Sequence, residues 1–305
     1  MAVTDIGASV IARLKNKAQT SGISFQVHLR LFCQEEFLRR LSLSKYADNL
    51  VLKGGLFLFV LSGFESRATI DIDFLLRQIP GSVEDARRIV SEIINTPSGN
   101  DVITFEMSSF EEITPQRKYK GVSFQLIGKI KNTKTPFNVD FGIGDVIVPK
   151  AEKRIIPTQL DAFTPPEIST YSLESTVAEK FDAMLQRMEL TSRMKDYYDL
   201  YFIARTFDFD GRKLQEAIII MQTLQNRGTD YDSSSFDEII SFSENSAMLV
   251  KWRQFLRRTK LPNIEFNEVT ALLNTFLGGI WNAIINEDEW LKSWSCQTTS
   301  WLGNN

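Results

Sequence analysis

Apolar residues recur at the spacing of a helix in the first part of the chain, up to about Ser44. Phe25, Leu29 and Phe32 follow one another at intervals of about one helical turn, and charged residues lie between them. The pattern predicts helical structure and places His28 among residues that pack in a core. We therefore expect His28 to be a structural histidine.

From residue 50 the pattern changes to short apolar runs and to alternation of apolar with polar residues. The run 50–52 ends in a Lys-Gly-Gly turn, and the apolar run 56–61 after it predicts a buried helix. Alternating segments predict strands, and a capping Ser82 predicts the start of a helix. This mixture indicates an α/β or α+β first half. The predicted strands are 70–76, 102–107, 122–130 and 137–141, and the predicted helix is 82–94.

The clearest boundary signal in the chain is Thr164-Pro165-Pro166, because proline interrupts regular structure. Beyond it almost every segment has the period of a helix. We expect two domains, 1–165 and 166–305, and a polar tail after Trp294 that is loose apart from Trp301. The predicted helices of the second domain are 173–188, 196–206, 212–225, 247–258 and 268–285, with a polar loop at 228–235.

Composition removes several classes of function. The chain of 305 residues has one His, so a histidine-based triad would have to use His28. Its two Cys, Cys33 and Cys296, cannot build a disulfide framework or a four-cysteine zinc site. The N-terminal segment lacks the apolar core of a signal peptide, and the apolar run 54–64 is too short to span a bilayer. We expect a soluble, cytoplasmic protein with no membrane partner.

Three aspartates on predicted strands form the first candidate site. Asp71 and Asp73 are two residues apart, so their side chains project from one face of a strand, and Asp140 lies on another alternating strand. Carboxylate oxygens suit Mg²⁺, and metal ions held by carboxylates support phosphoryl transfer. Asp145 is a weaker candidate, because glycines around it indicate that the strand is ending. The alternative is a solvent-facing strand edge without function.

Paired glycines precede these carboxylates. Gly54 and Gly55 would let the backbone approach a phosphate closely, and the N-terminus of the helix that follows favours anions. Lys53 would add positive charge. An ordinary glycine turn is the alternative, and it is the combination with Asp71 and Asp73 that favours function.

A second candidate set lies in the helical half. Asp196 and Asp199 are three residues apart and share one face of a helix. Lys180, on the preceding helix, and Lys195 are placed where a cation could meet a triphosphate. The structural alternative is that an aspartate near a helix N-terminus stabilises the helix dipole and that Lys180 pairs with Asp196. The spacing leaves both interpretations open.

Basic clusters are candidates for RNA contact, and Tyr119 and Trp252 lie among them as surfaces on which bases can stack. The 35 basic and 38 acidic residues give a net charge of −3, so an RNA substrate requires a basic cleft on an otherwise acidic surface. Solvated faces are the alternative, and the helical spacing around Trp252 predicts that part of its cluster is core. The clusters are Arg117-Lys118-Lys120, Lys129-Lys131-Lys134, Lys150-Lys153-Arg154 and Arg253-Arg257-Arg258-Lys260.

Four motifs follow one another between Leu52 and Leu200. They are Leu52-Lys53-Gly54-Gly55 with Arg67-Ala68-Thr69-Ile70-Asp71-Ile72-Asp73-Phe74, then Val139-Asp140-Phe141-Gly142-Ile143-Gly144-Asp145, then Ala178-Glu179-Lys180, then Arg193-Met194-Lys195-Asp196-Tyr197-Tyr198-Asp199-Leu200. Together they resemble the motifs of the AbiEii/AbiGii toxin family, which belongs to the DNA-polymerase-β-type nucleotidyltransferases. Residue 56 is Leu, where that superfamily often has Ser or Thr.

The resemblance implies an α+β fold, with a polymerase-β-type mixed sheet and flanking helices followed by a C-terminal helical bundle that completes the active site. It implies a toxin of toxin–antitoxin and abortive-infection systems, with a cognate antitoxin as partner. Such a toxin transfers a nucleotide from a nucleoside triphosphate, with Mg²⁺, to RNA and in some members to the acceptor end of tRNA. The alternatives are transfer to a small-molecule or protein hydroxyl, or an inactive relative that binds RNA or a partner.

The resemblance also implies roles for individual residues. Asp71, Asp73 and Asp140 would hold metal. The nucleotide would be bound by residues from both halves, and one of two helical aspartates would orient the acceptor hydroxyl. The implied nucleotide-binding residues are Lys53, Gly54, Gly55, Arg67 and Lys180, and the implied catalytic residues are Asp71, Asp73, Lys180, Asp196 and Asp199.

Overall fold

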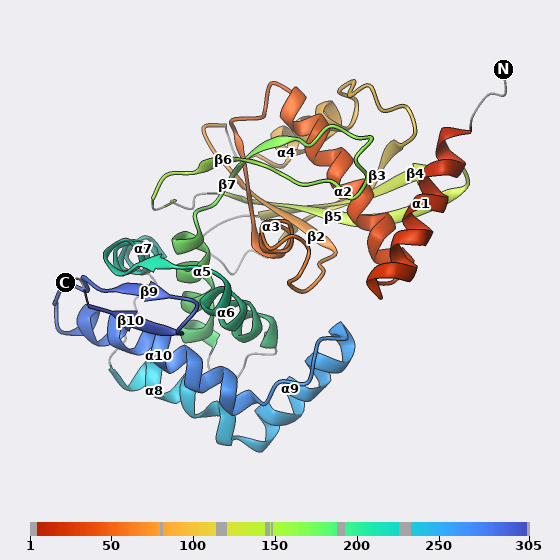
Figure 1. The fold of residues 1–305 in the computed structure, drawn as a ribbon. Coiled ribbons are helices and arrows are strands. Elements are labelled where there is room, and N and C mark those ends of the chain that lie inside the picture. Colours follow the sequence, from red (N-terminus) through yellow and green to blue (C-terminus); the bar gives the residue numbers. More distant parts are fainter. Residues whose placement is uncertain are drawn as a thin grey trace. The chain divides into compact units, whose positions relative to one another are not determined.

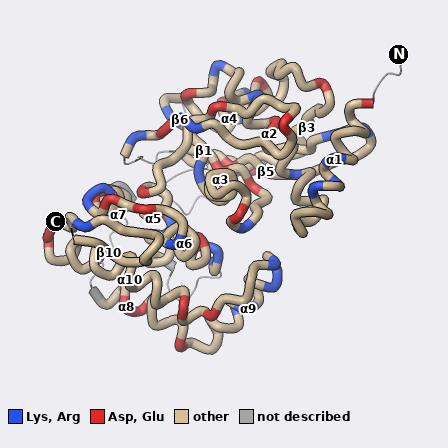
Figure 2. The backbone as a smooth tube through the Cα atoms, viewed as in Figure 1, with Lys and Arg blue, Asp and Glu red and all other residues tan. Residues whose placement is uncertain are grey.

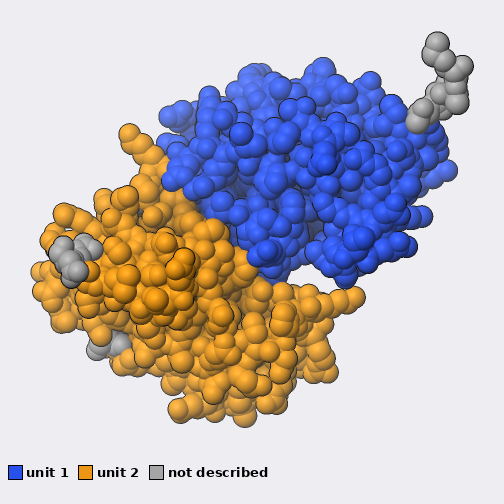
Figure 3. All heavy atoms as spheres, in the orientation of Figure 1, with its two compact units in different colours: residues 1–145, 151–171 blue, residues 146–150, 172–305 orange. Residues whose placement is uncertain are grey.

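The chain divides into two compact units (Figure 3). A computed structural model describes residues 5–79, 82–113, 121–143, 147, 149–187, 193–225 and 233–303. Unit 1 holds residues 1–145 and 151–171, and unit 2 holds residues 146–150 and 172–305. The chain therefore enters unit 2 briefly, returns to unit 1, and then completes unit 2.

Unit 1 is built on a seven-stranded mixed sheet with the strand order β3-β4-β5-β2-β1-β7-β6 (Figure 1). β2 pairs with β5 and β1 with β7 in parallel, and the other neighbours are antiparallel. The predicted mixed sheet with flanking helices, followed by a helical part, is confirmed. The strands are β1 (Leu50–Lys53), β2 (Asp71–Leu76), β3 (Thr104–Ile113), β4 (Gly121–Ile130), β5 (Thr133–Ile143), β6 (Glu152–Ile155) and β7 (Glu167–Thr170).

Two of these strands were not expected from the sequence. β6 and β7 form an antiparallel pair, and β7 adds to β1 directly after the proline pair. The expectation of an almost wholly helical chain beyond that pair is therefore wrong for β7. Each strand has only four residues, which is too short for alternation to stand out.

Among the described residues four helices accompany the sheet, and the mostly buried helix α2 packs on it. The ring of Phe37 lies 6.1 Å from that of Phe74 and 6.4 Å from that of Phe137. Because side chains alternate along a strand, the neighbours of Phe74 on β2 point to the other face of the sheet. The helices are α1 (Ile6–Ser21), α2 (Phe25–Leu43), α3 (Gly54–Leu61) and α4 (Val83–Ile94), which begins after the cap Ser82 as predicted.

Polar side chains of α2 are buried beside this core. His28 is 4% exposed and bonds to Ser21 at 2.8 Å, with Gln159 at its other ring nitrogen, so its predicted structural role is confirmed. Glu35 Oε1 accepts the Gln159 backbone N–H at 3.0 Å, whereas its Oε2 has no hydrogen-bond partner among the described residues. Burial raises the pKa of Glu35 to about 8.

Unit 2 consists of helices and one small sheet. Its core is aromatic, with the ring of Phe181 5.4 Å from Trp281 and that of Trp252 stacked 5.0 Å from Phe266. The predicted loop 228–235 falls partly on residues that lie outside the described ones, and from Ser233 it is helical. The helices are α5 (Leu173–Arg187), α6 (Met194–Thr206), α7 (Gly211–Gln225), α8 (Ser233–Ser241), a 3₁₀ turn (Phe242–Glu244), α9 (Ser246–Thr259) and α10 (Phe266–Ile285).

The tail that we expected to be loose is ordered. It forms the hairpin β9 (Ser293–Ser295) and β10 (Ser300–Leu302), and β9 also pairs with the short β8 (Phe209–Asp210). Trp294 donates from Nε1 to Ala204 O at 2.7 Å, and Trp301 donates to Phe276 O at 2.9 Å. Two indole hydrogen bonds, that of Trp294 buried and that of Trp301 partly buried, thus fix a segment whose composition is polar.

Helix α10 is long and apolar enough, by length and composition alone, to cross a membrane. However, half of its apolar window is buried inside the protein. Leu273, Phe276 and Trp281 are at most 1% exposed. These side chains pack within unit 2, so α10 serves as its core helix.

Candidate active site

The three sheet aspartates lie on neighbouring strands of unit 1. Asp73 of β2 is the direct register partner of Asp140 on β5, and parallel neighbours lie about 4.8 Å apart. Asp71 and Asp73 are partly exposed, whereas Ile72 between them is fully buried. The predicted placement of Asp71 and Asp73 on one face, with Asp140 beside them, agrees with this register.

Neutral side chains orient two of these carboxylates. Asn138 Nδ2 donates to Asp71 Oδ1 at 2.9 Å, and Ser123 Oγ donates to Asp140 Oδ1 at 2.6 Å. Both donors sit on adjacent strands at register positions facing the carboxylates. Such hydrogen bonds fix the direction of a carboxylate without cancelling its charge.

Gly54 begins α3 directly against Asp73. Its φ is 70°, a left-handed conformation that favours glycine. A Cβ placed on Gly54 would lie 2.1 Å from Asp73 Oδ2. No side chain fits there, so the glycine is required by the close approach of the backbone to the carboxylate.

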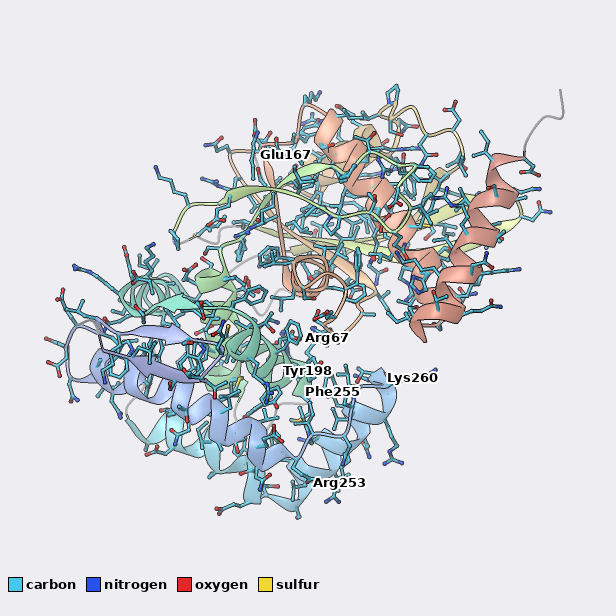
Figure 4. All side chains as sticks on the ribbon, viewed as in Figure 1. Arg67, Glu167, Tyr198, Arg253, Phe255 and Lys260 are labelled. Carbon is cyan, nitrogen blue, oxygen red and sulfur yellow. The ribbon has the colours of Figure 1, made fainter. Side chains whose placement is uncertain are left out.

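The second glycine faces the segment that leads into β2. A Cβ on Gly55 would lie 3.2 Å from Thr69 Oγ1 and 3.3 Å from an Arg67 guanidinium nitrogen. Arg67 is labelled in Figure 4. Leu56 is fully buried, so the hydroxyl that comes close to the glycine turn belongs to Thr69. Sequence reasoning did not single out Thr69, because the contact joins residues that are not adjacent in the chain.

Lys53 ends β1 as the register partner of Asp73. Its ammonium group lies 5.4 Å from the centre of the Tyr171 ring, at the end of β7. This cation–π contact helps to hold the lysine beside the glycine turn.

The residues predicted in the helical half form a buried ion cluster in unit 2. Lys180 Nζ lies 2.5 Å from Asp199 Oδ2 and 3.6 Å from Asp196 Oδ1. Arg193 Nε lies 2.7 Å from Asp196 Oδ2. Lys180 is 7% exposed, and Asp196 and Asp199 are 1% and 2% exposed. The structure therefore brings Lys180, Asp196 and Asp199 together. The spacing left open whether Lys180 pairs with Asp196; this ion pair is present, and its N–O distance is longer than that of the pair with Asp199.

The donor chemistry of the sheet site fits magnesium. Among the described residues, no three His, Cys, Asp or Glu side chains are already grouped as a metal site. Mg²⁺ needs fewer, because it is usually bound by one or two carboxylates together with substrate phosphates and water. Asp73 and Asp140 supply such a pair. Asp145, the weaker candidate, lies outside the described residues.

The basic clusters differ in their surroundings. Lys129 and Lys131 form ion pairs with Glu106 and Asp5, which reduces their attraction for RNA. Trp252 is 2% exposed, so the idea that it stacks on bases is wrong and the expectation that it is core is confirmed. The predicted cluster at 117–120, including Tyr119, lies outside the described residues.

Paired charges also occupy the cluster after residue 150. Lys153 lies 3.0 Å from Asp48, and Arg154 pairs with Glu152. Among the described parts of the chain, Arg253, Arg257 and Arg258 of α9 form no such ion pair.

The sequence was compared with known proteins. It matches the model of the family described as "Nucleotidyl transferase AbiEii toxin, Type IV TA system" over residues 36–272. Solved structures with a similar fold include JHP933 from Helicobacter pylori, at 14% identity over 87% of this chain and 94% of that one, with a TM-score of 0.48. A second solved structure is that of a protein from H. pylori provisionally assigned as a nucleotidyltransferase. It is 13% identical over 87% of this chain and 96% of that one, with a TM-score of 0.48. No protein with a curated description matches.

Proposed function

This chain belongs to the AbiEii family of nucleotidyltransferase toxins of type IV toxin–antitoxin systems, and we propose that it transfers a nucleotide from a nucleoside triphosphate to RNA. We propose the acceptor end of tRNA as the site of transfer and Mg²⁺ as the metal. The observation that carries the proposal is the pairing of Asp73 with Asp140 on adjacent strands, with the Gly54 backbone against Asp73.

Each part of the sheet site has a role in this reaction. An acceptor hydroxyl attacks the α-phosphorus of the nucleotide, and pyrophosphate leaves. Asp73 and Asp140, with Asp71 beside them, would hold Mg²⁺, which supplies charge neutralisation at the phosphates. Gly54 and Gly55 would let backbone N–H groups approach the triphosphate.

Cationic and hydroxyl groups surround the same turn. Lys53 and Arg67 are proposed to bind the triphosphate, because their charges flank the two glycines. Thr69 is proposed to supply the hydroxyl that Leu56 lacks, since its Oγ1 adjoins Gly55.

The ion cluster of unit 2 is proposed to act in the same reaction. Lys180 would neutralise phosphate charge, and Asp196 and Asp199 would complete the active site, one of them orienting the acceptor hydroxyl. The contacts of Lys180 with both carboxylates support this proposal, because they hold its ammonium group in one place.

The family implies an antitoxin as partner, since its members are toxins of type IV systems. An RNA acceptor would place the activity in the cytoplasm. The partner thus follows from the family, and the location follows from the proposed reaction.

A transfer assay tests the proposal. The full-length protein is incubated with Mg²⁺, each labelled nucleoside triphosphate in turn, and total bacterial RNA, beside Asp73→Ala. We expect label in a tRNA-sized band, and we expect Asp73→Ala to lose it without losing the fold, which circular dichroism checks.

Each other outcome changes a different part of the proposal. Label on a protein or small molecule would keep the active site and replace the acceptor. Activity in Asp73→Ala would reject the metal assignment. No label with any nucleotide, together with no Mg²⁺-dependent nucleotide binding by calorimetry, would favour an inactive relative that acts by binding.

A further inference from the structure

Helix α9 of unit 2 ends in a basic surface beside a hollow. Three cationic side chains, Arg253, Arg257 and Lys260, line a hollow of about 530 Å³ together with Leu256, Leu261 and Asn263. We call these three cations the α9 basic surface. All three are exposed, and Figure 2 shows basic residues gathered at this end of α9.

The three cations lie along one side of the helix. Arg253 and Arg257 are four residues apart, and Lys260 follows three residues later, which places all of them on one face. At a rise of about 1.5 Å per residue they extend over about 10 Å. Lys260 is the C-cap, with φ 56°, and its N–H bonds to Leu256 O, so the end of the surface has a fixed backbone.

No acidic residue that the structure describes pairs with this surface. The segment 246–263 contains five Lys and Arg and no Asp or Glu. None of the three cations forms an ion pair with another residue in the described part of the chain. Lys129 and Lys131 of the β4–β5 hairpin, by contrast, pair with Glu106 and Asp5.

Helix stability explains only part of this charge. Cations in the last turn interact favourably with the helix dipole, and Arg257 lies in that turn. The effect falls off beyond one turn, and Arg253 lies six residues before the last helical residue. The helix dipole therefore does not account for Arg253, and its position beside the hollow points to a ligand.

The chemistry of the lining selects the ligand. Guanidinium groups bind phosphate oxygens through paired hydrogen bonds, and a lysine ammonium adds a point charge. A row of cations extending over about 10 Å suits successive phosphates of one chain better than a single phosphate. Leu256, Leu261 and Asn263 line the hollow beside this row of cations.

α9 is also fixed to the helix that carries the unit 2 ion cluster. Phe255, between the two arginines, lies 6.0 Å from Tyr198 between ring centres. Tyr198 is on α6, next to Asp199. Figure 4 labels Phe255 and Tyr198 with Arg253 and Lys260. The surface therefore keeps its position relative to Asp199.

We propose that the α9 basic surface binds the sugar–phosphate backbone of the RNA acceptor. This inference rests on the proposed function, in which the acceptor is RNA. The surface would hold RNA through charge, without reading its sequence.

Salt dependence of binding tests the proposal. Binding of end-labelled, deacylated bulk bacterial tRNA to the full-length protein is followed by fluorescence anisotropy across a KCl series, without nucleotide. Loss of three phosphate contacts lowers the slope of log K against log salt by about two. We expect that reduction, and at least about tenfold weaker binding near 0.1 M salt, for the triple variant Arg253→Gln, Arg257→Gln and Lys260→Gln.

A matched pair of single variants separates contact from general charge. Arg257 and Arg258 both lie in the last turn of α9, and only Arg257 lines the hollow. Arg257→Gln should lower the slope by about one, and Arg258→Gln should leave it unchanged. Thermal unfolding of each variant confirms that the fold is retained.

Calorimetry with Mg²⁺ and nucleotide separates this inference from the transferase proposal. A triple variant with the wild-type slope would overturn the α9 assignment, and so would wild-type protein that binds nucleotide but no tRNA. Equal slope changes for Arg257→Gln and Arg258→Gln would also overturn it. If tRNA binding depends on the α9 basic surface but the protein binds no nucleotide, the RNA-binding assignment of the surface is supported and the proposed nucleotidyl transfer is refuted.

Discussion

The two units carry carboxylates in opposite electrostatic settings. In unit 1, Asp71 and Asp140 are partly exposed and accept hydrogen bonds from the neutral groups of Asn138 and Ser123. In unit 2, Asp199 is buried and contacts Lys180 at 2.5 Å. A buried charge requires a counter-charge from the protein, whereas a partly exposed one can take its cation from solution. The comparison indicates that the sheet is suited to a metal and that the charges of the helical cluster compensate one another.

The largest expected effect separates activity from stability in the sheet. Asp140→Asn keeps the shape and an oxygen acceptor for Ser123, so the free energy of unfolding should change by less than about 1 kcal/mol. Loss of a metal ligand removes several kcal/mol of charge stabilisation, and transfer should fall about a thousandfold. Transfer assays and urea unfolding measure the two quantities. Asp101→Asn, an exposed aspartate, is the control, and transfer within tenfold of wild type would contradict the assignment of Asp140.

In unit 2 we expect the larger effect on stability, because the charges there are buried. Lys180→Met leaves the buried Asp199 and Asp196 without that cation, which should lower the free energy of unfolding by about 3 to 5 kcal/mol. Adding Asp199→Leu should recover part of this loss. Urea unfolding measures both, and Lys195→Met, at an exposed position, should stay within about 0.5 kcal/mol. A small loss for Lys180→Met would show that Lys180 is not required to compensate the buried carboxylates.

Two adjacent residues of α2 show the same contrast between a carboxylate that has a counter-charge and one that forms no ion pair with a described residue. Glu36 pairs with Arg39 and with Arg40 at 2.9 Å, whereas Glu35 accepts one backbone N–H and its pKa is raised to about 8 by burial. Below pH 4.5 Glu35 is protonated in both folded and unfolded chains. Between 4.5 and about 8 only the unfolded chain releases the proton, so the free energy of unfolding falls as pH rises.

Glu35→Gln should remove that fall, which is on the order of 1 kcal/mol per pH unit. The gain of the variant over wild type should therefore grow between about pH 5 and 8. Glu36→Gln should instead lose stability at neutral pH, because its arginines lose their partner. Urea unfolding across this range measures the differences, and two variants with the same sign would refute the contrast.

The smallest expected effect concerns the approach of Gly54 to Asp73. Gly54→Ala adds a Cβ that clashes with the carboxylate at a φ of 70°, which should cost about 1 to 3 kcal/mol and lower transfer. Gly99→Ala is the matched control, because its φ is 73° and nothing lies within 4 Å of its added Cβ. The difference between the two melting curves isolates the clash. Equal losses would mean that backbone strain alone explains Gly54.

Local patterns in the sequence predicted most of the sheet site. Alternation around Ile72 and around Val139 marked the strands and the faces of their aspartates. The direct pairing of Asp73 with Asp140 could not be predicted, because the two residues are far apart in the chain and only packing sets their register. Proximity of Thr69 to Gly55 was hidden for the same reason.

The missed elements were short or polar. β7 has four residues, and its place in the sheet depends on hydrogen bonds to β1. The hairpin near the C-terminus has mostly polar residues, and the burial of Trp294 together with the indole hydrogen bonds of Trp294 and Trp301 decides its structure. In both cases distant contacts, which no local pattern records, select the conformation.

The late return of the chain to unit 1 has a consequence during protein synthesis. β7 pairs with β1 through Leu52 and Thr170, and Tyr171 N–H bonds to Leu52 O at 2.9 Å. A nascent chain that has emerged only as far as residue 165 therefore carries β1 without this neighbour. The strand that leads into the Gly54 turn gains its second flank only when synthesis has passed β7, just before α5 is made, so the sheet is completed last at β1.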